Sequence, residues 1–458
     1  MWPTRLIAGL LTVAALFGQQ AVRSEELPPP PPSASTNAAD AQPWYADPAS
    51  GDATLQSVSY LQAQGGAQPA APNAAGQQPQ PQSRLTPPTQ SRNPFANRGN
   101  AQNSSPYLAR LSRAPDMYGD FFQPVGVSLD LARYINSGLP TGEIGSGIDS
   151  VLEGQVPLGG GMRRFKNEQT RALPTDRVFA TYNHFHNAVE LKSFDPTTGG
   201  VQSDASHIDQ YTIGVEKTFD DGNWSLELRM PFSGGADASV PSFQFNSDGV
   251  GNLSLTLKRL LYIDESLAVA AGIATTAPTG SNANIFIPIL QTRITVENDS
   301  VHLLPYIAAQ FTPDENWFFH SFAQIDVAAN PNGISLSVPG APTRGGSLSE
   351  QTLMYLDASA GYWWFRSDDD EGLTGLASIL EVHYTTTLND AQQNDLGTNG
   401  FFNAGNGQNR FDVVNLTVGA HSEWWQHTSV RAAVVVPLRS ENNRFFDSEF
   451  QLSLIRRF

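Results

Sequence analysis

The chain ends in SEFQLSLIRRF (448–458), where apolar and polar residues alternate up to a terminal aromatic residue. In an extended strand, successive side chains point to opposite faces. Phe450, Leu452 and Leu454 therefore share one face. Phe458 belongs to the same face, and Arg456 is its one charged member. The stretch predicts a final β-strand with an apolar face and a polar face.

Composition narrows the class of protein. The 458 residues are 40% hydrophobic and 16% charged, with 39 Gly and no Cys. The lack of cysteine fits an oxidising compartment. The formal net charge is −17, and the sequence has no basic stripe that could neutralise phosphates. We therefore expect no nucleic-acid partner.

The first part of the chain predicts targeting and tethering segments. In residues 1–24, the positively charged Arg5 precedes an apolar run over 6–17. The run is too short to span a bilayer, and this pattern is typical of a cleaved signal peptide. An N-terminal anchor, the alternative, would need a longer run. Residues 25–115 are rich in Pro, Ala and Gln and poor in large apolar residues. Such a segment cannot offset its ordering entropy, so we expect a disordered tether on the periplasmic side.

Alternation with period two recurs through the remaining range, 116–458. NLSLTLK (252–258), NWSLELRM (223–230) and VVNLTVGAH (413–421) each separate an apolar from a polar face. Alternation over about nine to eleven residues is the length that a tilted strand needs to cross a membrane. No run of about twenty apolar residues follows the signal, which excludes helical spanning. A closed barrel is the remaining way to satisfy backbone groups in lipid.

We predict an all-β fold, a transmembrane antiparallel up-and-down β-barrel of about twelve strands. The expected strands are 177–187, 208–219, 223–232, 250–262, 267–275, 300–311, 316–328, 351–364, 375–387, 411–424, 427–438 and 447–458. Segment 125–131 is left out because single-chain bacterial barrels have even strand numbers. Fourteen strands are the alternative, with 285–297 as a further possible strand. Residues 195–207, 330–351 and 389–410 are expected as loops on one rim, the outer one.

Ionised groups recur on the polar faces, as expected if one face meets lipid and the other a wet interior. The candidates for lining a pore are Glu216, Glu227, Arg229, Lys258, Asp357, Glu381, His383 and Arg431. Aromatic residues gather at the expected strand ends, as in YWWF (362–365) and EWW (423–425), which suits aromatic girdles at the two membrane interfaces.

Three stretches resemble known proteins. The final strand with its terminal Phe458 resembles the signature of bacterial outer-membrane β-barrels, which implies outer-membrane lipid and the barrel-insertion machinery as partners. Residues 249–280, with the preceding Asp248, resemble a strand-turn-strand passage of the outer-membrane family named for the meta-pathway of phenol degradation, although Asn252 replaces the usual Asp. LPTDRVFATYNHFHN (173–187) is similar to a pattern in uncharacterised barrels of planctomycete-type bacteria. Together they imply a channel or transporter-like barrel.

Motifs for catalysis are lacking: the sequence has no G-x-S-x-G elbow, H-E-x-x-H, P-loop or paired-cysteine site. We therefore expect no enzyme and no cofactor, and an outer-membrane hydrolase is the least supported alternative. His184 and His186 share a strand face with Tyr182 and could chelate a metal. Two ligands without an evident third favour polar lining of the lumen instead, so no metal site is predicted.

Our functional hypothesis is a channel for passive passage of small solutes, with selectivity set by pore width and lumen charge. The alternative is a structural or adhesive barrel with a filled lumen, because a twelve-stranded barrel can be open or blocked. Small polar residues such as Ser254 and Thr417 fit an open lumen, whereas Tyr306 and Phe322 fit a filled one. Residues 138–170 precede the strong strands and could fold inward as a constriction.

Overall fold

The structure is a computed structural model that describes most of the chain after residue 105. The described residues are 106–120, 124–130, 151–157, 166–195, 200–234, 238–240, 243–246, 249–368, 371–392, 394–395, 402–404, 409–440 and 443–458. The predicted signal peptide, and the predicted tether up to residue 105, lie outside this part.

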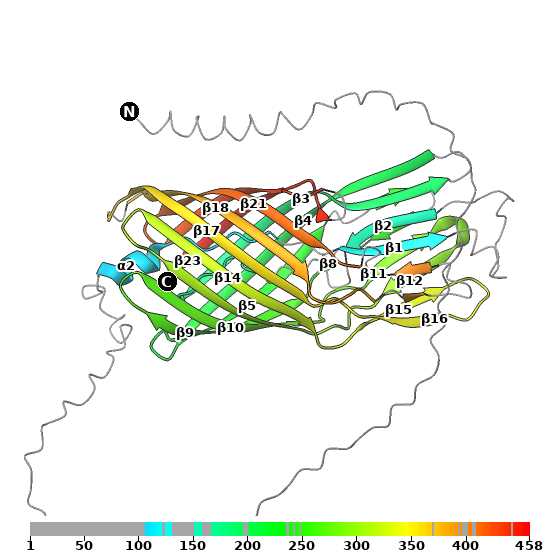
Figure 1. The fold of residues 1–458 in the computed structure, drawn as a ribbon, viewed down its shortest axis with the longest axis horizontal. Helices are drawn as coiled ribbons and strands as arrows, with labels where there is room; N and C mark the ends of the chain where they lie inside the picture. Colours follow the sequence, from blue (N-terminus) through cyan, green and yellow to red (C-terminus); the bar gives the residue numbers. More distant parts are fainter. Residues whose placement is uncertain are drawn as a thin grey trace, which may run out of the picture. The chain divides into compact units, whose positions relative to one another are not determined.

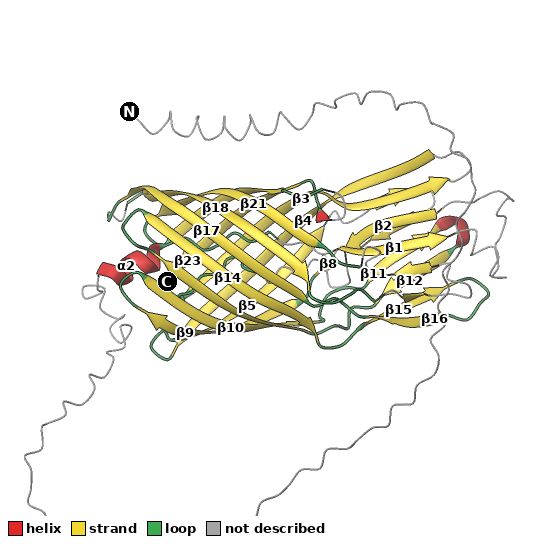
Figure 2. Ribbon diagram, in the orientation of Figure 1, coloured by secondary structure: helices red, strands yellow, loops and turns green. Residues whose placement is uncertain are grey.

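Twelve strands of the described residues close into an antiparallel barrel (Figures 1 and 2). They are β3 (Arg177–Asp195), β4 (Gly200–Phe219), β5 (Trp224–Gly234), β9 (Leu253–Ile263), β10 (Leu267–Ala277), β13 (His302–Phe311), β14 (Trp317–Ala328), β17 (Leu353–Arg366), β18 (Leu373–Thr387), β21 (Asp412–Trp424), β22 (Thr428–Pro437) and β23 (Ser448–Arg457). Each strand pairs with the next in this order, and β23 pairs with β3 to close the ring. The predicted fold class and strand number are confirmed.

Period-two alternation divides the side chains of the wall into two sets. On β23, Leu452 and Leu454 are 42% and 52% exposed on the outside, whereas Gln451 and Ser453 are buried. The same separation holds on β5, where Leu228 is exposed and Glu227 is buried. A closed barrel with an apolar outer face and a polar inner face is built to span lipid. Within the described part of the chain, no helix is long and apolar enough to cross a membrane.

The two ends of the barrel differ. Short connections (220–223, 264–266, 312–316, 367–372 and 425–427) lie at one end, together with the C-terminus. Helix α2 (Pro106–Arg113) lies at the same end, where Arg110 donates a hydrogen bond to the Glu265 carbonyl (Figure 1). The longer connections after β14 and β18 share the opposite rim and include the predicted loops 330–351 and 389–410. The loop predicted at 195–207 is wrong, because residues 200–207 belong to β4. In outer-membrane barrels, short turns are periplasmic and long loops extracellular.

The long connections, and the part of the chain before β3, contain further strands, which form a head beyond the extracellular rim (Figure 1). Six make a second sheet: β6 (Ala238–Val240), β7 (Phe243–Asn246), β11 (Ala283–Ile287), β12 (Thr292–Val296), β15 (Asn332–Ser337) and β16 (Arg344–Leu348). Five others extend the barrel sheet: β1 (Pro124–Asp130), β2 (Val151–Pro157), β8 (Gly249–Val250), β19 (Asn394–Asp395) and β20 (Phe402–Ala404).

The head contains the two segments whose assignment to the barrel was left open, 125–131 and 285–297. Segment 125–131 forms β1, which pairs with β2 and β20 and is not part of the barrel ring, so leaving it out was correct. Segment 285–297 forms most of the hairpin of β11 and β12 in the second sheet. The alternative of fourteen barrel strands is therefore wrong.

An apolar core, here called the head core, joins the second sheet to the inner rim of the barrel. From the rim it includes Phe185, Ile208, Leu353, Tyr355, Val413 and Val435, and from the second sheet Phe245, Ile285, Ile287, Ile294, Val296, Ile334 and Leu336. The rim residues come from β3, β4, β17, β21 and β22, whereas the second sheet arises from the loops after β5, β10 and β14. The head core therefore reaches over the extracellular mouth from one side to the other.

Glycines in the wall make room for aromatic rings from neighbouring strands. A Cβ added to the glycine would lie 2.0–2.4 Å from a ring atom of its register partner in three pairs, which are Phe179 with Gly214, Tyr306 with Gly272, and Phe318 with Gly361. Real Cβ contacts are not that short, so each ring occupies the place of the missing side chain. Such cross-strand pairs fix the register of a sheet.

Gly361→Ala should destabilise the barrel by about 1–3 kcal/mol, because the new methyl group overlaps the ring of Phe318. Denaturant unfolding in detergent micelles measures the change. Gly234→Ala is the matched control, since a Cβ there meets nothing within 4 Å. Equal midpoints for Gly361→Ala and the control would refute the role given to the glycine.

Candidate functional site

Two segments that do not belong to the wall fill the middle of the lumen. Residues 114–120 and 166–174 are all buried. The Met117 N–H donates to the Thr170 carbonyl at 3.0 Å, and the Gln169 N–H donates to the Met117 carbonyl at 2.9 Å. These bonds join the two segments into one unit, which we call the plug.

The plug bears on two sequence-based predictions. Helix α2 and residues 114 and 115 fall inside the range 25–115 that we predicted as a disordered tether, yet they pack at and within the barrel. Their composition gives no sign of this packing, because the strands that they contact lie far along the chain. Of the range 138–170, residues 166–170 lie in the lumen as expected, and 151–157 form β2 in the head. The rest of that range lies outside the described residues.

Arg177, the first residue of β3, is the centre of one ion-pair cluster. Its guanidinium lies 2.8 Å from Asp116 of the plug and 2.8 and 2.9 Å from Glu216 and Glu227 of the wall. It also donates to the carbonyl of Gln169 at 2.6 Å. All of these side chains are buried. A buried charge is stable only when it is paired, so Arg177 ties the plug to β4 and β5.

Lys258 and Arg229 complete this cluster from β9 and β5. The Lys258 ammonium lies 2.9 Å from Glu216, and Arg229 pairs with Glu227. On the plug, Arg171 lies 3.4 Å from Asp116. Cations and carboxylates therefore alternate across the lumen from the plug to the wall.

A second cluster surrounds Lys166 of the plug. Its ammonium lies 2.6 Å from Asp120 of the plug and 2.9 Å from Asp357 of β17. His383 of β18 lies 3.1 Å from Asp357 and 3.3 Å from Glu381. Asp120, Asp357 and His383 are close enough to bind a cation together. Lys166 already supplies a positive charge there, so this group is an ion-pair cluster and not a metal site.

Arg431 of β22 holds the plug between the two clusters. It donates to the side-chain oxygen of Gln169 at 2.8 Å and to the carbonyl of Asp116. Its guanidinium lies 4.0 Å from the centre of the Tyr118 ring, a cation–π contact. The Tyr118 N–H donates to Glu381 at 2.9 Å. The plug is thus bonded to the wall through both its backbone and its side chains.

The structure places all eight predicted pore-lining residues on the inner face of the wall, with exposures of 0–5%. The Arg177 cluster brings together Glu216, Glu227, Arg229 and Lys258. The Lys166 cluster brings together Asp357, Glu381 and His383, and Arg431 lies between them. Whether they line a path for solutes stays a prediction.

Sequence reasoning missed the residues at the cluster centres. Arg177 could have been found, because it alternates in phase with the inward Phe179 on a predicted strand. No such pattern marks the plug residues, because the plug sequence does not alternate between apolar and polar residues. These residues are Asp116, Asp120, Lys166 and Gln169. His184 and His186 were assigned to the lumen, which is wrong, because β3 points Arg177, Phe179 and Phe185 inward and the alternate positions outward.

The plug leaves little free space in the lumen. Between Lys166 of the plug and Glu227, Lys258, Tyr306 and Phe322 of the wall, the cavity is about 10 Å³, roughly the space for one water molecule. An apolar patch also joins the plug and helix α2 to β9, β10, β13 and β14. It consists of Leu111 of α2, Met117, Ala172 and Leu173 of the plug, and Leu260, Ala268, Ala270, Tyr306, Ala308 and Phe322 of the wall. Around this cavity, plug and wall are in contact.

The sequence matches no protein-family profile and no curated protein, so the resemblance to the meta-pathway family is not confirmed. The barrel is closed, its outer face is apolar and its inner face is polar. The chain is an outer-membrane β-barrel.

Three solved structures are each matched over 62% of this chain. The NanC porin is 9% identical over 98% of its own chain, with a TM-score of 0.35. An outer membrane channel from Pseudomonas putida F1 is 13% identical over 96% (TM-score 0.41). The β domain of the Bordetella autotransporter BrkA is 10% identical over 100% (TM-score 0.37).

Asp116→Asn should loosen the plug, because it leaves Arg171 and part of Arg177 without a counter-charge. Unpairing a buried charge costs about 3–5 kcal/mol. The chain has no native Cys, so Ala114→Cys, at a fully buried plug position, supplies a single reporter thiol. We expect its labelling by a water-soluble maleimide to speed up at least about 100-fold in the Asp116→Asn background.

Asp390→Asn in the same Ala114→Cys background is the control, since Asp390 pairs with Arg410 on the exposed extracellular side. The control should label like the parent. Fast labelling of the parent itself, or no acceleration by Asp116→Asn, would contradict an ion-paired plug.

Proposed function

We propose that this barrel is an outer-membrane channel for small polar solutes, in which the plug must leave the lumen before a solute can pass. The observation that supports it most is the chemistry of the plug–wall contact. Ion pairs and hydrogen bonds from Arg177, Lys166 and Arg431 join the plug to the wall, beside two apolar patches. Water can replace such contacts at a small net free energy, whereas it cannot replace apolar packing.

Removal of the plug would leave a polar lumen. Arg177 and Lys258 would keep their wall partners Glu216 and Glu227 at 2.8–2.9 Å, so ion pairs would line that lumen. Because both signs are present, we expect weak selection by charge and stronger selection by size. Screening over about 8 Å at physiological salt limits the effect of the −17 net charge on the lumen.

A structural or adhesive barrel is the second candidate, and the head core favours it. That core covers the extracellular mouth with apolar side chains from the rim and from the second sheet. A polar solute does not cross packed apolar side chains. If the head core stays closed in the membrane, the barrel is a scaffold that presents the head.

Ion conductance across a planar bilayer tests the proposal. The parent protein should show rare openings, and Asp116→Asn combined with Asp120→Asn should show frequent or long ones, because both plug carboxylates lose their charge. Asp390→Asn should resemble the parent. The solute class follows from blocking currents by neutral sugars, amino acids and small organic ions.

Thiol labelling makes a silent result informative. If the double variant stays silent while its Ala114→Cys form labels quickly, the plug moves without opening a path. That outcome would refute the channel and support the structural barrel. Silence with slow labelling would refute the role of the two plug carboxylates in holding the plug.

A further inference from the structure

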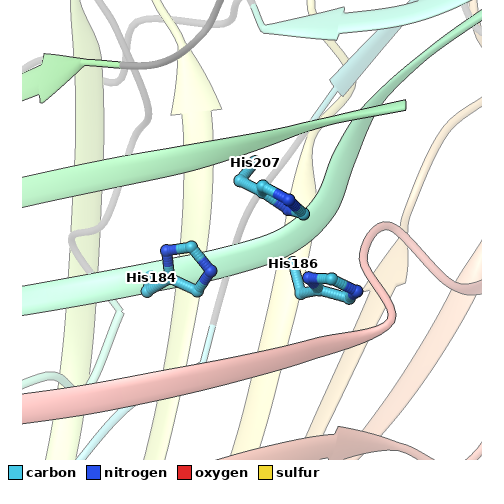
Figure 3. A group of neighbouring side chains, drawn as sticks. All are labelled: His184, His186 and His207. Carbon is cyan, nitrogen blue, oxygen red and sulfur yellow. The ribbon is translucent and has the colours of Figure 1, made fainter. Parts of the chain in front are cut away.

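Three histidines from neighbouring strands converge on the outer surface of the barrel (Figure 3). His184 and His186 belong to β3 and His207 to β4. The ring centres lie 4.5 Å apart for His186 and His207, 5.3 Å for His184 and His207, and 6.5 Å for His184 and His186. One ring nitrogen of each lies within 4.8 Å of those of the other two.

A break in strand register brings the third histidine into place. β3 and β4 pair residue by residue up to Phe185 and Ile208, and pairing resumes at Val189 and Ser206. Residues 186–188 therefore face His207 alone, which is a β-bulge. Asn187 takes a left-handed conformation at φ 53°, and its side chain donates to Asp447 at 2.7 Å. The bulge re-aims His186 toward His207.

The group lies at the extracellular edge of the lipid-facing surface. One step toward the membrane, Tyr182 and Tyr211 form an aromatic pair with ring centres 5.2 Å apart. Beyond them the outward residues are apolar, such as the exposed Ile213 and Val215. Tyrosines mark the membrane–water interface of barrels. The histidines therefore face water or headgroups, and His186 and His207 are exposed.

Asp209 orients the group from behind. Its carboxylate lies 2.8 Å from Nδ1 of His184 and accepts a hydrogen bond from the Tyr182 hydroxyl at 2.7 Å. A carboxylate bonded to Nδ1 of a neutral histidine places the proton there and leaves the Nε2 lone pair free for a metal. Such carboxylate–histidine pairs are typical supports of metal ligands.

We propose that His184, His186 and His207 bind one transition-metal ion of the Zn²⁺ type, with water in the fourth position. Three neutral imidazoles suit Zn²⁺, Cu²⁺ or Ni²⁺, whereas Mg²⁺ and Ca²⁺ require oxygen ligands. Ligand distances of about 2.0–2.1 Å require the nitrogens to approach one another more closely than the 4.8 Å limit. The rings of His186 and His207 are stacked at 15°, so one must rotate, and their exposure leaves room for it.

Such an ion would link β3 to β4 at the bulge, just above the membrane. The site is separate from the lumen and does not depend on the channel proposal. Because His186 and His207 are exposed, a water or an anionic group of the outer leaflet would complete the coordination.

Metal titration of the full barrel tests the site. The protein is prepared in detergent without a polyhistidine tag, stripped with EDTA and titrated with Co²⁺, whose visible spectrum reports tetrahedral nitrogen ligands. Zn²⁺ then competes with the Co²⁺. We expect one equivalent to bind, and His207→Asn to abolish the spectrum. Asp209→Asn should weaken binding about 10–100-fold, as loss of an outer-shell carboxylate does.

His427→Asn is the matched control, because His427 is exposed in the short turn at the opposite end of the barrel. It should leave the stoichiometry and affinity unchanged. The proposal is overturned if the parent binds no Co²⁺ or Zn²⁺, or if His207→Asn binds like the parent. Binding that is lost only in His427→Asn would also overturn it.

Discussion

The pairing of β23 with β3 is the contact on which the rest of the structure depends. It runs from Ser448 opposite His186 to Arg457 opposite Arg177 and leaves the barrel ring without a free edge. In lipid, every backbone N–H and C=O needs a partner within the protein, and a closed sheet provides it. Closure also turns simple alternation into two environments, because every second residue of each strand now faces an enclosed space.

Charged wall residues buried in the enclosed space need counter-charges, and the plug provides some of them. Arg177 lies at the closing seam and carries a charge that cannot remain unpaired when buried. Two of its three carboxylate partners come from the wall, and the third, Asp116, comes from the plug. Lys166 reverses the arrangement, since a plug cation meets Asp357 of the wall. Charges of both signs on both sides make the plug electrostatically complementary to this wall.

The sequence predicted the wall well because its signal is local. Alternation can be recognised within ten residues, so the twelve strands and the faces of Leu452 or Glu227 follow from the chain itself. The plug has no such period, and its contacts join residues far apart in the sequence, as Asp116 with Arg177 and Tyr118 with Glu381. His207 was missed for a related reason. Only the register between two strands, with its bulge, shows that it lies beside His186.

The lumen is closed twice, and the two closures differ in kind. The plug is held by ion pairs and hydrogen bonds together with apolar contacts of its residues Ala114, Met117, Tyr118, Ala172 and Leu173. The head core is apolar throughout, so opening it costs far more hydrophobic free energy. On the proposed function, the plug is therefore the part that moves.

The head core also limits where a solute could pass. Among the described residues, its rim members come from β3, β4, β17, β21 and β22, and none comes from β5, β9, β10, β13 or β14. The small cavity beside the plug is lined by that second group, including Glu227, Arg229 and Lys258. A path opened by plug movement would run along this side, past charged wall residues, as far as the head core. The charges that hold the closed plug would then be the ones that a passing solute meets.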